Sequence, residues 1–172
     1  VCPVRALLGR SQDGTHCRHC LGETDTLPHV MGTCPHSEML RNPRHHQIRS
    51  MIANELRKTH QVEEEVHGIS IDGSHRRFDI IAIPSGYTNG FIIDPTIRME
   101  TGEEQPLQVH NEKCLIYDPT IPYYLDKYHL TSIKVLGLLI GARGAIPRQL
   151  VNFSKQFHLF NAFLKDLSLL PF

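Results

Sequence analysis

The sequence lacks several features that would assign it to common protein classes. It has no run of about 18 or more apolar residues, so a membrane span is not expected. It opens on Val1, Cys2 and Pro3, without an initiator methionine or a signal-peptide pattern, so we expect the chain to begin within a longer protein. The formal net charge is zero, which counts against a large phosphate-binding surface because nucleic-acid-binding proteins are usually basic. Local clusters of basic residues remain compatible with such binding.

Cysteine is too scarce for a disulfide scaffold, since the chain has five cysteines in 172 residues. Three of them follow the spacing C-x2-C-x8-H-x4-C, formed by Cys17, Cys20, His29 and Cys34. A tight turn presents the first two thiols and one helical turn presents the last two ligands, which predicts a closed, structural Cys3His zinc site in a reducing compartment. The alternative fourth ligands are His16, His19 and His36.

Hydrophobic periodicity predicts a mixed α/β domain after this motif. The expected elements are a helix at 43–58, strands near 62–71, 78–83 and 91–97, helices at 109–117 and 123–128, a buried central strand at 133–140 and a long final helix from Pro147. Asp72-Gly73 and the 85–90 segment supply the hairpin turns. The predicted order is therefore helix, three-stranded meander, helix, strand, helix, with a small N-terminal zinc appendage.

Two aspartates interrupt the apolar strands at 78–83 and 91–97. Asp79 and Asp94 are costly to bury unless they are paired or bind a metal. Two carboxylates and the carbonyl of Pro95 suit Mg²⁺ or Mn²⁺, which would support phosphodiester hydrolysis. Lys113 would orient water or stabilise developing negative charge, and Tyr117 lies one helical turn further on the same face. The alternative is that both aspartates sit at strand ends in solvent.

Basic and acidic clusters flank these strands. The candidates for nucleic-acid contact are Arg41, Arg44, Arg49, Arg76 and Arg77. A solvated helix face is the alternative for the arginines of the 43–58 helix. One of the acids at 63–65 is a further candidate for approaching the metal, although a solvated strand edge is more common for such a triplet.

These motifs together resemble one known family. The order R-x-D, hairpin, I-I-D and helical E-K-x3-Y, preceded by the cysteine motif and a basic R-x2-R-H-H helix, resembles the C-terminal region of site-specific non-LTR retrotransposon proteins of the insect type. The resemblance covers roughly residues 5–145. It departs from the general superfamily pattern at Thr96, where that pattern has its lysine, and at Phe78, where a proline usually precedes the first aspartate.

The resemblance implies a fold, an activity and partners. The fold is a PD-(D/E)xK restriction-endonuclease-like core, with a CCHC zinc knuckle at residues 17–42, the endonuclease at 43–172 and the tail of a preceding domain at 1–16. The activity is metal-dependent nicking of DNA for target-primed reverse transcription, with Asp79 and Asp94 as metal ligands and Lys113 and Tyr117 beside them. The implied partners are the DNA target, element RNA and an upstream reverse transcriptase of the same polyprotein, in the nucleus.

Two other functions are compatible with these residues. The chain could be an inactive or domesticated remnant whose knuckle still binds nucleic acid. A weaker alternative is a zinc-stabilised interaction domain without a nucleic-acid role. The presence of Asp79, Asp94 and Lys113 together favours the nuclease, because a decaying copy has no reason to keep all three.

Overall fold

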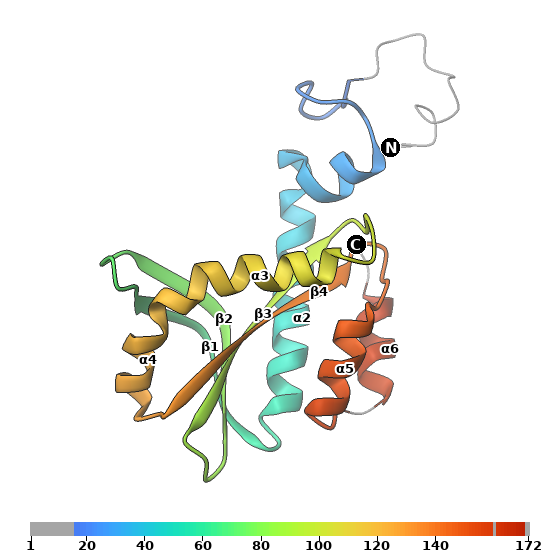
Figure 1. Ribbon diagram of the computed structural model, residues 1–172. Helices are drawn as coiled ribbons and strands as arrows, with labels where there is room; N and C mark the ends of the chain where they lie inside the picture. Colours follow the sequence, from blue (N-terminus) through green and yellow to red (C-terminus); the bar gives the residue numbers. More distant parts are fainter. Residues whose placement is uncertain (1–15, 160, 171–172) are drawn as a thin grey trace.

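The computed structural model describes residues 16–159 and 161–170 and has a mixed α/β architecture (Figure 1). In chain order its elements are η1 (His29–Thr33), η2 (Pro35–Ser37), α2 (Glu38–Leu56), β1 (His60–Ile69), β2 (His75–Pro84), β3 (Asn89–Arg98), α3 (Gln105–Tyr117), η3 (Asp118–Thr120), α4 (Ile121–Tyr128), β4 (Ser132–Gly141), α5 (Arg148–Gln156) and α6 (Asn161–Leu169). The predicted order of helix, three strands, helix, strand and helix is confirmed. The expected tail at 1–16 lies outside the described residues, apart from His16.

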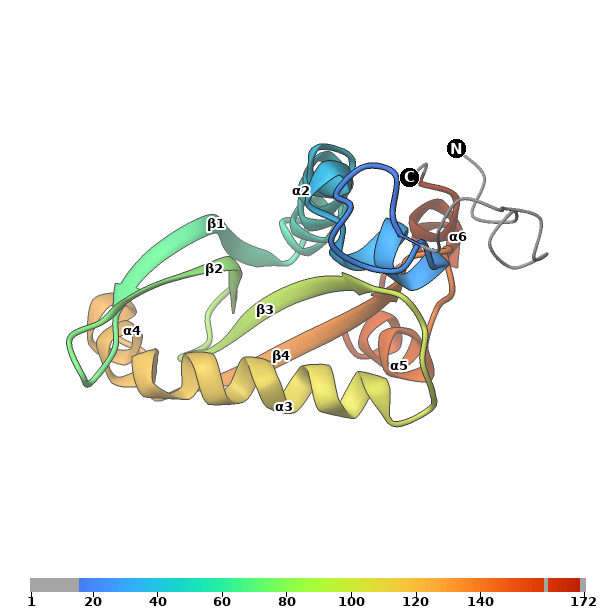
Figure 2. The same ribbon diagram turned by 90° about the horizontal axis from the view of Figure 1, so that it is seen from above.

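The four strands form one sheet in the order β1-β2-β3-β4. The pairs β1–β2 and β2–β3 are antiparallel, as expected of a meander, and β4 pairs with β3 in parallel. A parallel neighbour requires a crossover connection, and α3 and α4 supply it. Both faces of the sheet are therefore covered, with α2 and α3 on opposite sides (Figure 2).

Two hydrophobic clusters hold these layers together. The larger lies between the sheet and α2, α5 and α6, with Ile48 and Ile52 of α2 packed against Ile80 and Ile93 of the strands. The smaller lies on the opposite face and joins Phe78 and Ile92 to α3 and α4. No helix in the described part of the chain combines the length and hydrophobicity needed to cross a membrane.

Three sequence predictions about these elements were wrong in detail. The first helix begins at Glu38 rather than Pro43, so α2 contains Pro43 in its first turns. The run at 133–140 forms β4 at the edge of the sheet, not its centre; it is strongly apolar because clusters on both faces bury it. The expected long final helix is two helices, because α5 ends at Gln156 and His158 takes a left-handed conformation with φ 54°.

The cysteine motif and the sheet share one helix. Residues 16–37 lie at the N-terminal end of α2 and project beyond the sheet (Figure 1). The same helix then packs Ile48 and Leu56 into the larger core cluster. Because α2 runs across the predicted boundary at 42/43, the knuckle is joined to the sheet through a continuous helix.

Tyr124 offers a test of the smaller cluster. Its side chain is fully buried, and its hydroxyl has no hydrogen-bond partner among the described residues. An unsatisfied buried hydroxyl costs free energy, so we expect Tyr124→Phe to raise the free energy of unfolding by about 1 kcal/mol in urea denaturation. The control is Tyr128→Phe, because the Tyr128 hydroxyl donates to Glu63 Oε2 at 2.8 Å. Loss of this hydroxyl should not raise the free energy of unfolding. Equal loss of stability in both variants would contradict this account.

Candidate metal centre and catalytic site

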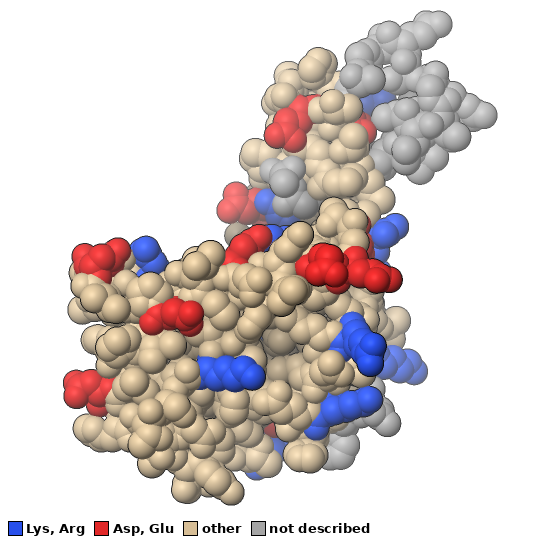
Figure 3. Space-filling model, in the orientation of Figure 1, with Lys and Arg blue, Asp and Glu red and all other residues tan. Residues whose placement is uncertain are grey.

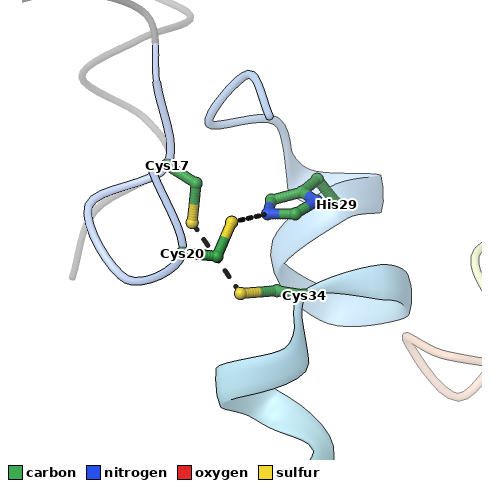
Figure 4. A group of neighbouring side chains, drawn as sticks. All are labelled: Cys17, Cys20, His29 and Cys34. Carbon is green, nitrogen blue, oxygen red and sulfur yellow. Dashed lines mark hydrogen bonds between the residues drawn. The ribbon is translucent and has the colours of Figure 1, made fainter. Parts of the chain in front are cut away.

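Four side chains of the cysteine motif converge at the N-terminal end of the molecule (Figure 4). One ligand atom from each of Cys17, Cys20, His29 and Cys34 lies within 4.8 Å of the others. The Cys17 and Cys34 sulfurs are 3.8 Å apart, and Cys20 Sγ lies 3.2 Å from His29 Nε2. Tetrahedral zinc with Zn–S bonds of about 2.3 Å places its sulfurs about 3.8 Å apart. The quartet therefore fits a CCHC knuckle, and His29, rather than His16, His19 or His36, lies with the three cysteines.

The surroundings of the quartet also suit a metal. Glu23 lies 3.0 Å from His29 Nδ1, and a carboxylate at the second ring nitrogen orients a metal-binding histidine through Nε2. Backbone N–H groups of Cys20 and His19 lower the pKa of Cys17 to about 7, which favours the thiolate that a metal requires. Burial raises the pKa of Cys34 above its ordinary value. Among described His, Cys, Asp and Glu side chains, only this quartet forms so close a group.

A second cluster of polar residues lines a cavity of about 350 Å³ against β2, β3, α2 and α3. Asp79 and Asp94 both line it, as do Pro95, Lys113 and Tyr117. The remaining lining residues are Arg41, Asn42, His45, Arg77, Thr96 and Ile97. The structure thus brings together all the residues that the sequence singled out for catalysis.

Sheet register explains why the two aspartates meet. The last paired position of β2 and β3 is Ile80 with Ile93, and one step further along both strands lie Asp79 and Asp94. Both aspartates therefore lie at the point where the ladder between β2 and β3 ends, and both line the cavity there.

The strand β1 is also distorted beside Asp79. Its ladder with β2 passes from Glu64–Ile80 to Val66–Phe78 and skips Glu65, which has a left-handed φ of 53°. A regular strand would place Phe78 and Ile80 on the same face, but they pack into opposite core clusters. The chain therefore turns at Asp79, which frees this residue from ladders on both sides and directs it to the cavity.

Asp94 is the most buried charged group of the site, with 4% of its surface exposed. Lys113 Nζ lies 2.8 Å from its Oδ1, and the Tyr117 hydroxyl donates to its Oδ2 at 2.5 Å. Burial raises the pKa of Asp94 above its usual value, although the Lys113 ammonium opposes this shift. Burial also raises the pKa of Tyr117, which stays a hydroxyl donor. Both oxygens of Asp94 are thus oriented by α3.

Gly137 makes room for Lys113, a role that no sequence motif signals. Gly137 of β4 pairs with Asp94 of β3 in the parallel ladder. A Cβ atom at this position would lie 2.8 Å from Lys113 Cγ and 3.0 Å from the His110 Cα. The missing side chain therefore lets α3 approach the sheet closely enough for Lys113 to reach Asp94.

His45 of α2 is a site residue that the sequence did not reveal. Its Nε2 lies 3.1 Å from Asp79 Oδ2 and 3.0 Å from the Pro95 carbonyl oxygen. The hydrogen bond to Asp79 raises the pKa of His45 above its ordinary value, while burial opposes the shift. The R-x2-R-H-H run placed this histidine on a basic helix, but only the tertiary fold shows that it reaches β2 and β3.

Two of the arginines predicted to contact nucleic acid are engaged inside the protein instead. Arg44 is 3% exposed and donates to the Ala142 carbonyl, because its helix face is turned toward the end of β4. Arg49 is 12% exposed at its side chain and binds the carboxylates of Glu64 and Glu65, which anchors the distorted part of β1. Both guanidinium groups bind partners within the protein, which argues against phosphate contact by Arg44 and Arg49.

The other predicted arginines lie nearer the cavity or the surface. Arg41 lines the cavity and donates to the Cys34 carbonyl at 3.0 Å, and Arg77 lines it on an exposed position of β2. Arg76 is half-buried and donates to the His75 carbonyl. Figure 3 shows Lys, Arg, Asp and Glu interspersed over one face of the molecule, without a single basic patch.

The acidic triplet of β1 does not join the site. Glu64 and Glu65 bind Arg49, and Glu64 also binds Arg57 at 2.8 Å. Glu63 accepts from the Tyr128 hydroxyl. None of the three lines the cavity, so the suggestion that one of them approaches the metal was wrong; their charges are balanced by neighbouring cations and a hydroxyl.

The fold and these two clusters define a mixed α/β domain that carries a cysteine-histidine cluster and a polar cavity lined by two aspartates. No protein-family model matches the sequence. The chain is 28% identical over 145 residues, 83% of its length, to the "Retrovirus-related Pol polyprotein from type-1 retrotransposable element R2" of Popillia japonica. The match spans 30% of that polyprotein. The resemblance to a non-LTR retrotransposon protein is thereby confirmed, and the Cys17, Cys20, His29 and Cys34 cluster agrees with it.

Proposed function

We propose that this chain is the zinc-knuckle and endonuclease part of a non-LTR retrotransposon polyprotein, which nicks target DNA with a divalent cation. The observation that carries the proposal is that Asp79 and Asp94 line one cavity at the end of the β2–β3 ladder, where Lys113 binds Asp94. Similarity to the R2 Pol polyprotein supports it. The order of helix, meander, helix and strand supports a restriction-endonuclease-like PD-(D/E)xK core for residues 43–172.

The donor set of the cavity fits a hard divalent cation. Asp79 and Asp94, with the Pro95 carbonyl, would hold Mg²⁺ or Mn²⁺, because these ions prefer carboxylate and carbonyl oxygens. A bound cation would neutralise charge on a phosphate and lower the pKa of an attacking water. The buried Asp94 carboxylate is costly without such compensation, which Lys113 supplies in part.

The side chains of α3 complete the proposed mechanism. Lys113 holds a fixed positive charge at the cavity wall, where it would stabilise negative charge that develops on a phosphodiester. Tyr117 acts through Asp94, because its hydroxyl donates to Oδ2 and holds the carboxylate plane in place. Arg77 and Arg41 line the same cavity, so they are the candidates for contacting the DNA backbone.

The knuckle at residues 17–42 would bind one structural zinc ion. Its four ligands close the coordination sphere, so it would contribute to folding and docking and leave the chemistry to the cavity. The proposed partners are target DNA, element RNA and a reverse transcriptase of the same polyprotein, and a DNA target would place the protein in the nucleus.

Gly137→Ala tests the placement of Lys113. The added methyl group would collide with Lys113 and the α3 backbone, so we expect nicking to fall by about 10- to 100-fold and stability by about 1–3 kcal/mol. Gly102→Ala is the matched control, because a Cβ at Gly102 meets nothing within 4 Å. Plasmid-nicking rates and urea unfolding curves measure the two effects. Wild-type activity in Gly137→Ala would show that the position of Lys113 is unimportant.

The direct test of function is conversion of supercoiled plasmid to open circles by the zinc-loaded protein. We expect nicking with Mg²⁺ or Mn²⁺, none with EDTA, and a 3′-hydroxyl that a DNA polymerase extends. Plasmid binding without nicking under any divalent cation would overturn the proposal and favour an inactive nucleic-acid-binding remnant. Neither binding nor nicking would favour a zinc-stabilised interaction domain.

A further inference from the structure

His45 of α2 lines the cavity, and the proposed function gives it no role. We propose that His45 is a nitrogen ligand of the cation, bound through Nε2 beside Asp79 and the Pro95 carbonyl. This inference rests on the proposed function and adds to it, because it makes the site a mixed oxygen and nitrogen centre. It draws on a third segment of the chain, far in sequence from β2 and β3.

Distances around Nε2 carry the proposal. The ring nitrogen lies 3.1 Å from Asp79 Oδ2 and 3.0 Å from the Pro95 oxygen. Neighbouring ligands of an octahedral ion with bonds of roughly 2.0–2.1 Å stand about 2.9 Å apart. One N–H can contact both oxygens, and an ion bound by all three groups would hold them at closely similar separations.

The position of His45 is fixed by its neighbours on α2. Arg44 is buried and donates to the Ala142 carbonyl, and Ile48 is buried in the larger core cluster. These contacts set the rotation of the helix, so the His45 ring cannot leave the cavity by a rotation of α2. The adjacent His46 is exposed and lies outside the cavity.

A nitrogen ligand has a consequence for metal choice. Mg²⁺ accepts oxygen ligands almost exclusively, whereas imidazole binds transition ions, and affinity for such sites rises along the first-row series from Mn²⁺. The site should therefore hold Mn²⁺ more tightly than Mg²⁺. Substituting His45 by asparagine should reduce Mn²⁺ affinity by at least about tenfold and change Mg²⁺ affinity less.

Electron spin-echo envelope modulation of bound Mn²⁺ tests the ligand directly. Zinc-loaded wild type, His45→Asn and His46→Asn would each receive less than one equivalent of Mn²⁺, after circular dichroism confirms that all three are folded. We expect imidazole nitrogen modulation in wild type and in His46→Asn, and its loss in His45→Asn. Calorimetric Mn²⁺ and Mg²⁺ affinities for the same proteins would show the change in preference.

The outcomes separate this inference from the proposed function. Mn²⁺ that binds wild type and is lost in Asp79→Asn, but shows no nitrogen modulation, would overturn the role of His45 and leave the oxygen site standing. Modulation that persists in His45→Asn would overturn it as well. Mn²⁺ binding that is absent, or unchanged in Asp79→Asn, would overturn both proposals.

Discussion

Replacing Asp94 by asparagine should reduce the rate of plasmid nicking by at least about 100-fold while the protein stays folded. Asparagine keeps the shape of the side chain and can still accept from the Tyr117 hydroxyl, but it loses the charge that attracts a cation. The lost charge matters because Asp94 is 4% exposed, so solvent screens it little. Single-turnover nicking with saturating Mn²⁺ measures the effect.

The matched control for Asp94→Asn is the same substitution at Asp126, which is exposed on α4 and lies outside the cavity. Asp126→Asn should nick at the wild-type rate. Circular dichroism and thermal melting of both variants exclude unfolding, which matters because Lys113 loses its carboxylate partner in Asp94→Asn. If Asp94→Asn nicks as fast as Asp126→Asn, Asp94 is not part of the catalytic machinery.

Replacing Cys34 by serine should abolish zinc binding and the ordered structure of residues 16–37. The buried hydrophobic residues described in this segment are Cys17 and Cys34, both expected metal ligands, so little else can hold it together. Metal binding in such small motifs supplies the free energy of folding. Elemental analysis should find one zinc ion per chain in wild type and close to none in Cys34→Ser.

Hydrogen exchange would show how far the loss of zinc spreads. We expect fast exchange at 16–37 in Cys34→Ser and retained protection in β2 and β3, whose core contacts are independent of the knuckle. The control is Cys114→Ser on α3, which should keep its zinc because Cys114 lies outside the quartet. If freshly purified, reduced wild-type protein contained no zinc, the zinc-knuckle assignment would be wrong.

The sequence predicts most of the elements because their patterns are strong and local. Apolar runs bounded by Gly and Asn turns mark β2 and β3, and the carboxylates inside these runs are conspicuous. Lys113 and Tyr117 follow at helical spacing, so their common face can be inferred without a structure. The C-x2-C spacing likewise suffices to predict that the thiols of Cys17 and Cys20 lie together. These predictions depend on residues close together in the chain.

What the sequence does not predict depends on contacts between distant segments. The reach of His45 to Asp79 follows from how α2 packs on the sheet, and the need for Gly137 follows from how closely α3 approaches β4. The inward-facing Arg44 and Arg49 resemble ordinary surface arginines in sequence, because their partners Ala142 and the β1 glutamates lie elsewhere in the chain. The helix α5 ends just before His158, which takes a left-handed conformation, and no glycine at this position marks the end in the sequence.

The central claim is that Asp79 and Asp94 form a cation site in one cavity, and anomalous scattering from crystals soaked in Mn²⁺ tests it most directly. Data collected on either side of the zinc absorption edge would identify zinc among Cys17, Cys20, His29 and Cys34, as an internal reference. We predict a manganese peak between Asp79, Asp94 and the Pro95 carbonyl. The account would be contradicted if crystals soaked at Mn²⁺ concentrations that support nicking showed the zinc peak in the quartet but no manganese peak in the cavity.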